Sequence, residues 1–262
     1  MKYVIGKRKL GMYLAIGLWL LCFGIIETKS QAIEGVIMYE QKVDWARIYA
    51  RLDYLSQEQK DRILLTWRQQ SLEKYNMKLT FNATQSYYTH ETGQGQTDDG
   101  RYSWKLPTYL ATRDFENNTQ SDWLEMLGRL YLVDDSLQLP KWKVLNKIKD
   151  IGGYVCMLAE TEDTLRHLKV HAWFADGIPA PVGPGDYIGL PGAILELDIN
   201  DGDIVVSAVN ITLRPVSKEE LTPAKQRKAR KISVEERDRL IYKHITDSIR
   251  ARRSPYGSIP FL

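Results

Sequence analysis

The chain has 262 residues, of which 44% are hydrophobic and 26% are charged. That length and composition allow a substantial core and exclude a disordered, collagen-like or disulfide-scaffold protein. The net charge of +3 is unevenly distributed: residues 1–32 carry +4, residues 33–213 carry −8 and residues 214–262 carry +7.

Residues 1–32 have the pattern of a signal peptide. Basic residues from Lys2 to Lys9 precede an apolar run over 10–26, and Ser30 and Ala32 provide the small residues of a cleavage site. The alternative is a membrane anchor, because an apolar run of this length is at the short limit for a spanning helix. We expect cleavage after Ala32 and an exported protein that is periplasmic or associated with the outer membrane.

Period-two alternation dominates the chain beyond residue 33 and predicts a mostly antiparallel β fold. Helical spacing of apolar residues appears only in two places, at about 45–73 and about 234–250. Within the first range, Ser56-x-x-Gln59 resembles a capping box and predicts that a second helix starts there. Asp201-Gly202 separates two strand-like runs and is typical of a hairpin turn. The predicted strands are at about 33–43, 76–91, 101–115, 129–134, 141–149, 153–162, 165–175, 193–199 and 203–213.

The pattern of potential catalytic and metal-binding residues indicates no established chemistry. Asp198-Ile-Asn-Asp-Gly-Asp203 resembles the start of a calcium loop, but its glycine comes one position early and no closing Glu follows, which favours a hairpin. Cys156 is the single cysteine left after cleavage, and its apolar neighbours indicate a buried strand residue rather than a nucleophile. We expect no catalytic residue, no metal and no cofactor.

The segment from 173 to 197 is unusually rich in proline and glycine, which restrict some backbone angles and free others. Two interpretations stay open, a structured connection between strands and a binding rim. The candidate binding residues are Trp173, Ile178, Pro179, Gly183, Pro184, Tyr187, Gly189, Leu190, Pro191 and Gly192.

The same segment carries a resemblance to a known family. Gly189-Leu-Pro-Gly-Ala-Ile194 resembles the signature of the GLPGLI family, and Ile151-Gly-Gly-Tyr-Val-Cys156 and Ala172-Trp173-Phe174 extend the similarity. Ala193 departs from the family, which commonly has Leu there. The resemblance implies an exported protein of Bacteroidota, with a β-rich GLPGLI-type domain over 33–215, no established catalytic residues and largely unassigned function.

The C-terminal part, 216–262, reads as a basic linker followed by a helix. Lys225–Lys231 has five basic residues in seven, and Ser233-x-x-Glu236 is a capping box for a helix at about 234–250. We expect the linker to be mobile and the basic tail to contact an acidic surface. Nucleic acid is not an expected partner of an exported chain, although the charge alone would favour it.

For the whole chain we expect an α+β fold, with a strongly bent, half-barrel-like antiparallel sheet that carries these helices. This is an architectural analogy with periplasmic lipoprotein carriers. The expected function is that of a non-enzymatic envelope protein, a binding or accessory module for an outer-membrane or secretion partner. The alternatives are a periplasmic carrier of a lipid or other hydrophobic ligand, and an uncharacterised hydrolase.

Overall fold

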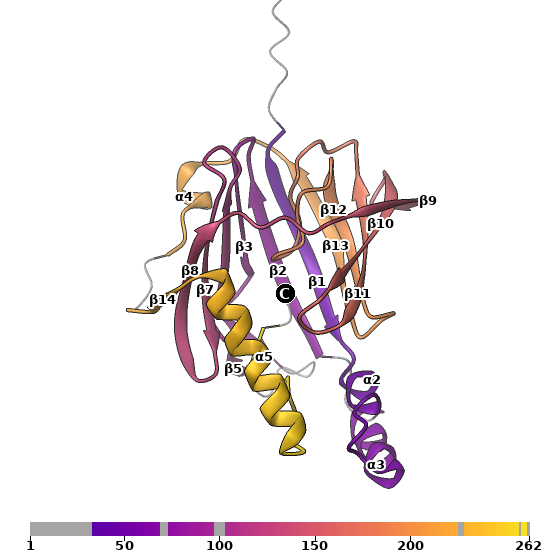
Figure 1. Ribbon diagram of the computed structural model, residues 1–262. Helices are drawn as coiled ribbons and strands as arrows, with labels where there is room; N and C mark the ends of the chain where they lie inside the picture. The colour runs from indigo at the N-terminus through magenta and orange to yellow at the C-terminus, as the bar shows by residue number, and fades with distance from the viewer. Residues whose placement is uncertain (1–32, 69–72, 97–102, 225–227, 257, 261–262) are drawn as a thin grey trace, which may run out of the picture. The chain divides into compact units, whose positions relative to one another are not determined.

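The computed structural model describes residues 33–68, 73–96, 103–224, 228–256 and 258–260 (Figure 1). The predicted signal peptide and its cleavage site after Ala32 lie outside these residues. Twelve strands form one sheet in the order β14-β8-β7-β6-β3-β2-β1-β13-β12-β11-β10-β9, and β4 and β5 form a separate hairpin. Every pair in the large sheet is antiparallel except β14 with β8.

The strands of the large sheet are β1 (Gly35–Val43), β2 (Glu73–Phe81), β3 (Gln85–His90), β6 (Tyr109–Asp114), β7 (Thr119–Met126), β8 (Arg129–Ser136), β9 (Lys143–Ile151), β10 (Tyr154–Asp163), β11 (Leu168–Ala175), β12 (Ala193–Ile199), β13 (Ile204–Leu213) and β14 (Arg230–Ile232). The hairpin consists of β4 (Gln94–Gln96) and β5 (Ser103–Lys105), and the helices are α2 (Trp45–Ala50), α3 (Gln57–Arg68), α4 (Lys218–Leu221) and α5 (Val234–Arg250).

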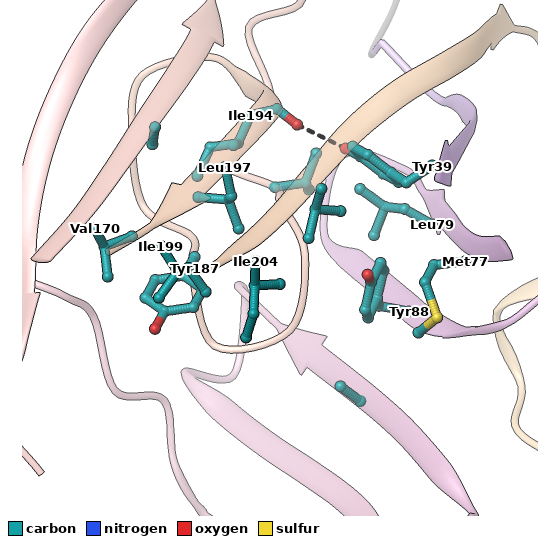
Figure 2. Close-up of a cluster of buried hydrophobic side chains, with 14 of the residues drawn as sticks. Tyr39, Met77, Leu79, Tyr88, Val170, Tyr187, Ile194, Leu197, Ile199 and Ile204 are labelled. Carbon is teal, nitrogen blue, oxygen red and sulfur yellow. Dashed lines mark hydrogen bonds between the residues drawn. The ribbon is translucent and has the colours of Figure 1, made fainter. Parts of the chain in front are cut away.

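The alternation that predicts the strands also builds the core. In β1, Ile37, Tyr39 and Val43 are buried at alternate positions and face the same side as buried residues of β2 and β12. The Tyr39 hydroxyl donates a 2.6 Å hydrogen bond to the Ile194 carbonyl, so this buried polar group has a partner (Figure 2).

The Pro- and Gly-rich segment of 176–192 belongs to this core. Ile178, Val182 and Ile188 are fully buried, and the amide of Ile194 donates to the Val182 carbonyl at 2.9 Å. The segment is therefore a packed connection between β11 and β12, which is the first of the two interpretations left open by the sequence.

The turn at Asp201-Gly202 joins β12 to β13 as predicted, with positive φ at Asn200, Asp201 and Gly202. The Asp198 carboxylate accepts a 2.6 Å hydrogen bond from the Gly202 amide. The carboxylate therefore stabilises the turn, as the hairpin interpretation requires.

Cys156 is completely buried in β10, in agreement with the sequence. Burial raises the pKa of the thiol to about 11, so at neutral pH it is protonated as well as inaccessible.

The two helices predicted within 45–73 are α2 and α3, and Ser56 and Gln59 form the predicted capping box before α3, but by Glu73 the chain has already entered β2. Other parts of the fold differ from the prediction. The strands predicted at 76–91 and 101–115 each divide in two, into β2 and β3 and into β5 and β6. Residues 230–232 of the basic linker, which was expected to be mobile, form β14 and pair with β8. Lys231 also forms a 2.5 Å ion pair with Asp134, so this part of the linker is fixed to the sheet. The central part, 225–227, lies outside the described residues.

The protein is mainly β, with an open sheet whose edges are β14 and β9 and with few helices. The finer description as an α+β half-barrel is not supported. The helices are few beside a twelve-stranded sheet, which includes two strands that the sequence did not predict, β7 and β14. Within the described residues, no helix has both the length and the apolarity needed to cross a membrane.

Candidate functional site

An aromatic pocket of about 530 Å³ lies where the ends of several inner strands of the large sheet meet. Because neighbouring strands are antiparallel, β1, β3 and β7 end there and β2 and β6 begin there, near the labels of α2 and β5 in Figure 1. The rings that line the pocket are those of Trp45, Tyr75, His90, Trp104, Tyr109 and Tyr256.

Trp45 is positioned by the change from strand to helix directly after β1. Asp44 caps α2, since its carboxylate accepts a 3.0 Å hydrogen bond from the Arg47 amide, and its own amide donates to the Asp203 carbonyl at 2.8 Å. The first residue of the helix is thereby held beside the end of β1.

Trp104 is positioned by the small hairpin. It pairs with Gly95, and a Cβ on Gly95 would come within 2.5 Å of the indole ring. Glycine therefore lets the ring lie directly over the opposite strand. The Trp104 side chain stays 41% exposed, which leaves part of the indole available to a ligand.

His90 is the last residue of β3 and lies between two tyrosines. Its ring centroid is 6.1 Å from that of Tyr75 and 6.4 Å from that of Tyr109. The Nδ1 atom is buried and has no hydrogen-bond partner within the described part of the chain. Burial lowers the pKa of the imidazole to about 4, so His90 is neutral at physiological pH.

The C-terminal segment forms another wall of the pocket. Tyr256, Ser258 and Ile259 line it, and the Leu127 amide donates a 2.8 Å hydrogen bond to the Ser258 carbonyl. Ile259 is buried, so the segment is packed against the sheet.

The remaining lining is largely apolar and its charges balance. Met77 and Met126 are buried below the rings. Lys105 and Glu125 are the charged residues of the lining, one of each sign. The Glu125 carboxylate accepts a 3.2 Å hydrogen bond from the Thr108 amide. Such a pocket suits a neutral and mostly apolar ligand.

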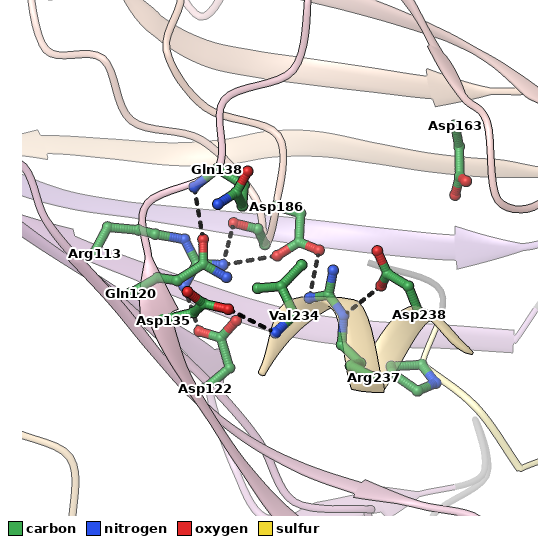
Figure 3. Close-up of polar contacts among 12 residues, drawn as sticks. Arg113, Gln120, Asp122, Asp135, Gln138, Asp163, Asp186, Val234, Arg237 and Asp238 are labelled. Carbon is green, nitrogen blue, oxygen red and sulfur yellow. Dashed lines mark hydrogen bonds and ion pairs between the residues drawn. The ribbon is translucent and has the colours of Figure 1, made fainter. Parts of the chain in front are cut away.

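A second pocket, of about 290 Å³, lies beside α5 and is more polar. Figure 3 shows the ion-pair network next to it, in which Arg113 of β6 contacts Asp122 of β7 and, at 2.8 Å, Asp186 of the 176–192 segment. Arg237 of α5 contacts the same Asp186 at 2.9 Å and Asp238 at 2.8 Å. The network ties the sheet, the segment and the helix together.

Burial and charge act in opposite directions on the two central carboxylates. Burial raises the pKa of Asp122, although Arg113 partly offsets this. Burial also disfavours the charged form of Asp186, but Arg237 and Arg113 together lower its pKa below the ordinary value. The charged groups of the network are mutually paired, so we assign it a structural role.

The structure does not bring the predicted binding residues together at the aromatic pocket. Six of them, Ile178, Gly183, Pro184, Tyr187, Leu190 and Gly192, are buried within the described fold. Pro179, Gly189 and Pro191 are exposed, and Trp173 is half-buried beneath Lys149, whose Nζ is 5.3 Å from the ring centroid. Tyr187 lines the polar pocket and none of the ten lines the aromatic one.

The sequence reasoning missed the aromatic pocket because its residues are far apart in the chain. The predicted strands also place these residues apart, because Tyr75 and His90 lie at opposite ends of the single strand predicted at 76–91 and Tyr109 lies in the middle of the one predicted at 101–115. The structure divides both predicted strands, which brings the three rings together in one pocket.

Solved structures of similar fold include two of PNGF-II. In the C2 space group the TM-score is 0.52 at 15% identity, covering 83% of this chain and 33% of that one. In the P21 space group the TM-score is 0.50 at 13% identity, covering 82% and 34%. The chain therefore spans about a third of the length of PNGF-II, and at this identity the likeness concerns the fold.

These matches contradict the expectation that the chain is not an enzyme, because they point toward an enzyme fold. That expectation was based on the lack of a recognisable catalytic motif, and catalytic groups that are brought together only by folding leave no such motif.

A family model described as a protein of unknown function (Porph_ging) matches residues 159–196, which include the Gly189–Ile194 motif. This agrees with a Bacteroidota protein of unknown function, whereas the GLPGLI assignment is not confirmed. No curated protein matches the chain.

Proposed function

We propose that the chain is an exported protein of the cell envelope that binds a hydrophobic ligand in the aromatic pocket. One observation carries the proposal, the gathering of six aromatic rings around about 530 Å³ of space at the ends of inner strands of the sheet. Ligand sites are typically concave and apolar, with few polar groups. Binding is the step that a carrier and an enzyme would share.

The proposal of export is supported by the N-terminal pattern alone, with its basic residues, apolar run and small residues at Ser30 and Ala32. N-terminal sequencing of the protein from the envelope fraction is expected to begin at Ile33. A sequence that begins at Met1 would contradict cleavage.

Ligand binding is tested with N-phenyl-1-naphthylamine, a neutral dye whose fluorescence rises in apolar surroundings. We expect saturable binding to the purified chain. Trp104→Leu removes a half-exposed ring of the pocket. It should weaken dye binding by roughly fivefold, because one stacked ring contributes about 1 kcal/mol to the binding free energy.

Trp173→Leu is the matched control, since it makes the same change in the half-buried side chain of another strand, outside the pocket. It should leave the dye affinity unchanged. A loss of affinity in Trp173→Leu without one in Trp104→Leu would place the site at the 173–192 segment and refute the pocket.

A further inference from the structure

One polar atom in the aromatic pocket has no protein partner, the Nδ1 atom of His90. It is buried, and no described residue donates to it or accepts from it. A buried polar atom without a partner is unfavourable, and such atoms are uncommon in folded proteins. Since His90 lines the pocket, an occupant of the pocket could supply the missing hydrogen bond.

The surroundings of His90 restrict the chemistry of that occupant. Tyr75 and Tyr109 flank the imidazole, and Met77 is its partner across the strand pair. The side chains next to the imidazole are therefore two phenol rings and a thioether. The part of the ligand beside His90 must therefore be apolar except for the group that meets Nδ1.

The neutral state of His90 restricts the polar group of the ligand further. A neutral imidazole has one N–H donor and one acceptor nitrogen, and either can be at Nδ1. A hydroxyl group both donates and accepts, so it can pair with Nδ1 in either tautomer. A carboxylate only accepts and an ammonium only donates, so neither group can pair with Nδ1 in both tautomers.

We propose that the aromatic pocket recognises a neutral, mostly apolar ring that carries a hydroxyl group, and that His90 is the residue that selects for this hydroxyl. This inference rests on the proposed binding function and names the class of ligand.

The test compares three probes of similar shape, 1-naphthol, 1-methoxynaphthalene and naphthalene, through displacement of bound N-phenyl-1-naphthylamine. The wild-type chain should bind 1-naphthol roughly fivefold more tightly than the other two, the effect of one neutral hydrogen bond of about 1 kcal/mol. 1-Methoxynaphthalene can accept but not donate a hydrogen bond. If it bound as tightly as 1-naphthol, Nδ1 would be the donor, and selection for the hydroxyl would be refuted.

Two substitutions at the same position make the test specific. His90→Leu removes the polar atom and should abolish the preference for 1-naphthol while naphthalene still binds. His90→Asn keeps a short polar side chain that both donates and accepts, and should retain a preference. A purely structural role of His90 would lower the affinity for all three probes equally in both variants.

The failure of this inference can be distinguished from failure of the proposed function. If the wild-type chain binds all three probes with equal affinity, or if His90→Leu keeps the preference, the role of His90 is refuted and the binding pocket stands. If no probe displaces the dye and the dye itself does not bind, the proposed function is refuted, and this inference with it.

Discussion

At the scale of single residues, His90 couples the pocket to the stability of the fold. Its folded-state pKa of about 4 lies below the ordinary value of 6.5 because burial disfavours the imidazolium. Between these values the unfolded chain binds a proton that the folded chain does not. The stabilisation that depends on neutral His90 is therefore fully present above pH 6.5, and it is lost as the pH falls toward 4.

We expect His90 to account for at most about 3 kcal/mol of the stability lost between pH 7 and pH 4. The measurement is urea unfolding of the wild-type chain and of His90→Leu at both pH values. The variant should lose less stability on acidification, by up to this amount. Equal losses in both chains would show that His90 does not carry this pH dependence.

Gly192 illustrates a second residue-scale effect, the close approach of two backbone segments. We find positive φ at Gly185 and Gly189 of the segment, which glycine accommodates readily, but Gly192 is required for another reason. A Cβ at Gly192 would lie 2.0 Å from the Ala175 carbonyl oxygen.

Gly192→Ala should destabilise the chain by about 2–3 kcal/mol or more, because neither backbone can move without disturbing the β11–β12 pair. Gly93→Ala is the control, since a Cβ there meets no atom within 4 Å, and it should change stability by less than about 0.5 kcal/mol. Thermal unfolding compares the two variants. A Gly192→Ala chain as stable as its control would contradict the packing described for this segment.

At the scale of elements, the sequence predicts most strands because their apolar residues alternate. β12 is found at the predicted residues 193–199, and α5 coincides with the expected helix at 234–250. β7 escapes prediction because its inward positions include Gln120 and Asp122, which are buried polar residues. Their partners, the Gln138 amide and the Arg113 guanidinium, come from other strands and connections.

β14 was missed for a different reason. Arg230 and Lys231 look like solvated linker residues, and only pairing with β8 and the ion pair of Lys231 with Asp134 make them a strand. Short edge strands depend on a neighbour that local sequence does not reveal.

The attachment of α5 leads to an element-scale prediction. Ser233 caps the helix, Ile241 is buried, and Arg237 reaches Asp186. Hydrogen exchange should therefore be slow over 240–250 and over 230–232, and faster in the β4–β5 hairpin, which contacts the rest of the chain less. Fast exchange over 240–250 would mean that the helix is detached in solution.

At the scale of the whole molecule, the sequence predicts a mainly antiparallel β protein. It does not predict the aromatic pocket that forms where several strand ends meet. The aromatic rings of the pocket extend from Trp45 to Tyr256, and no local pattern links them. The Pro- and Gly-rich segment attracted attention because it is compositionally unusual, but its composition serves close packing.

The most direct test of the account uses the chain labelled with 5-fluorotryptophan. Fluorine spectra are recorded while N-phenyl-1-naphthylamine is added, with resonances assigned through single Trp→Phe variants. We predict that the resonances of Trp45 and Trp104 shift, because both indoles line the aromatic pocket, and that those of Trp142 and Trp173 stay in place. Shifts at Trp142 and Trp173 with none at Trp45 and Trp104 would contradict the account.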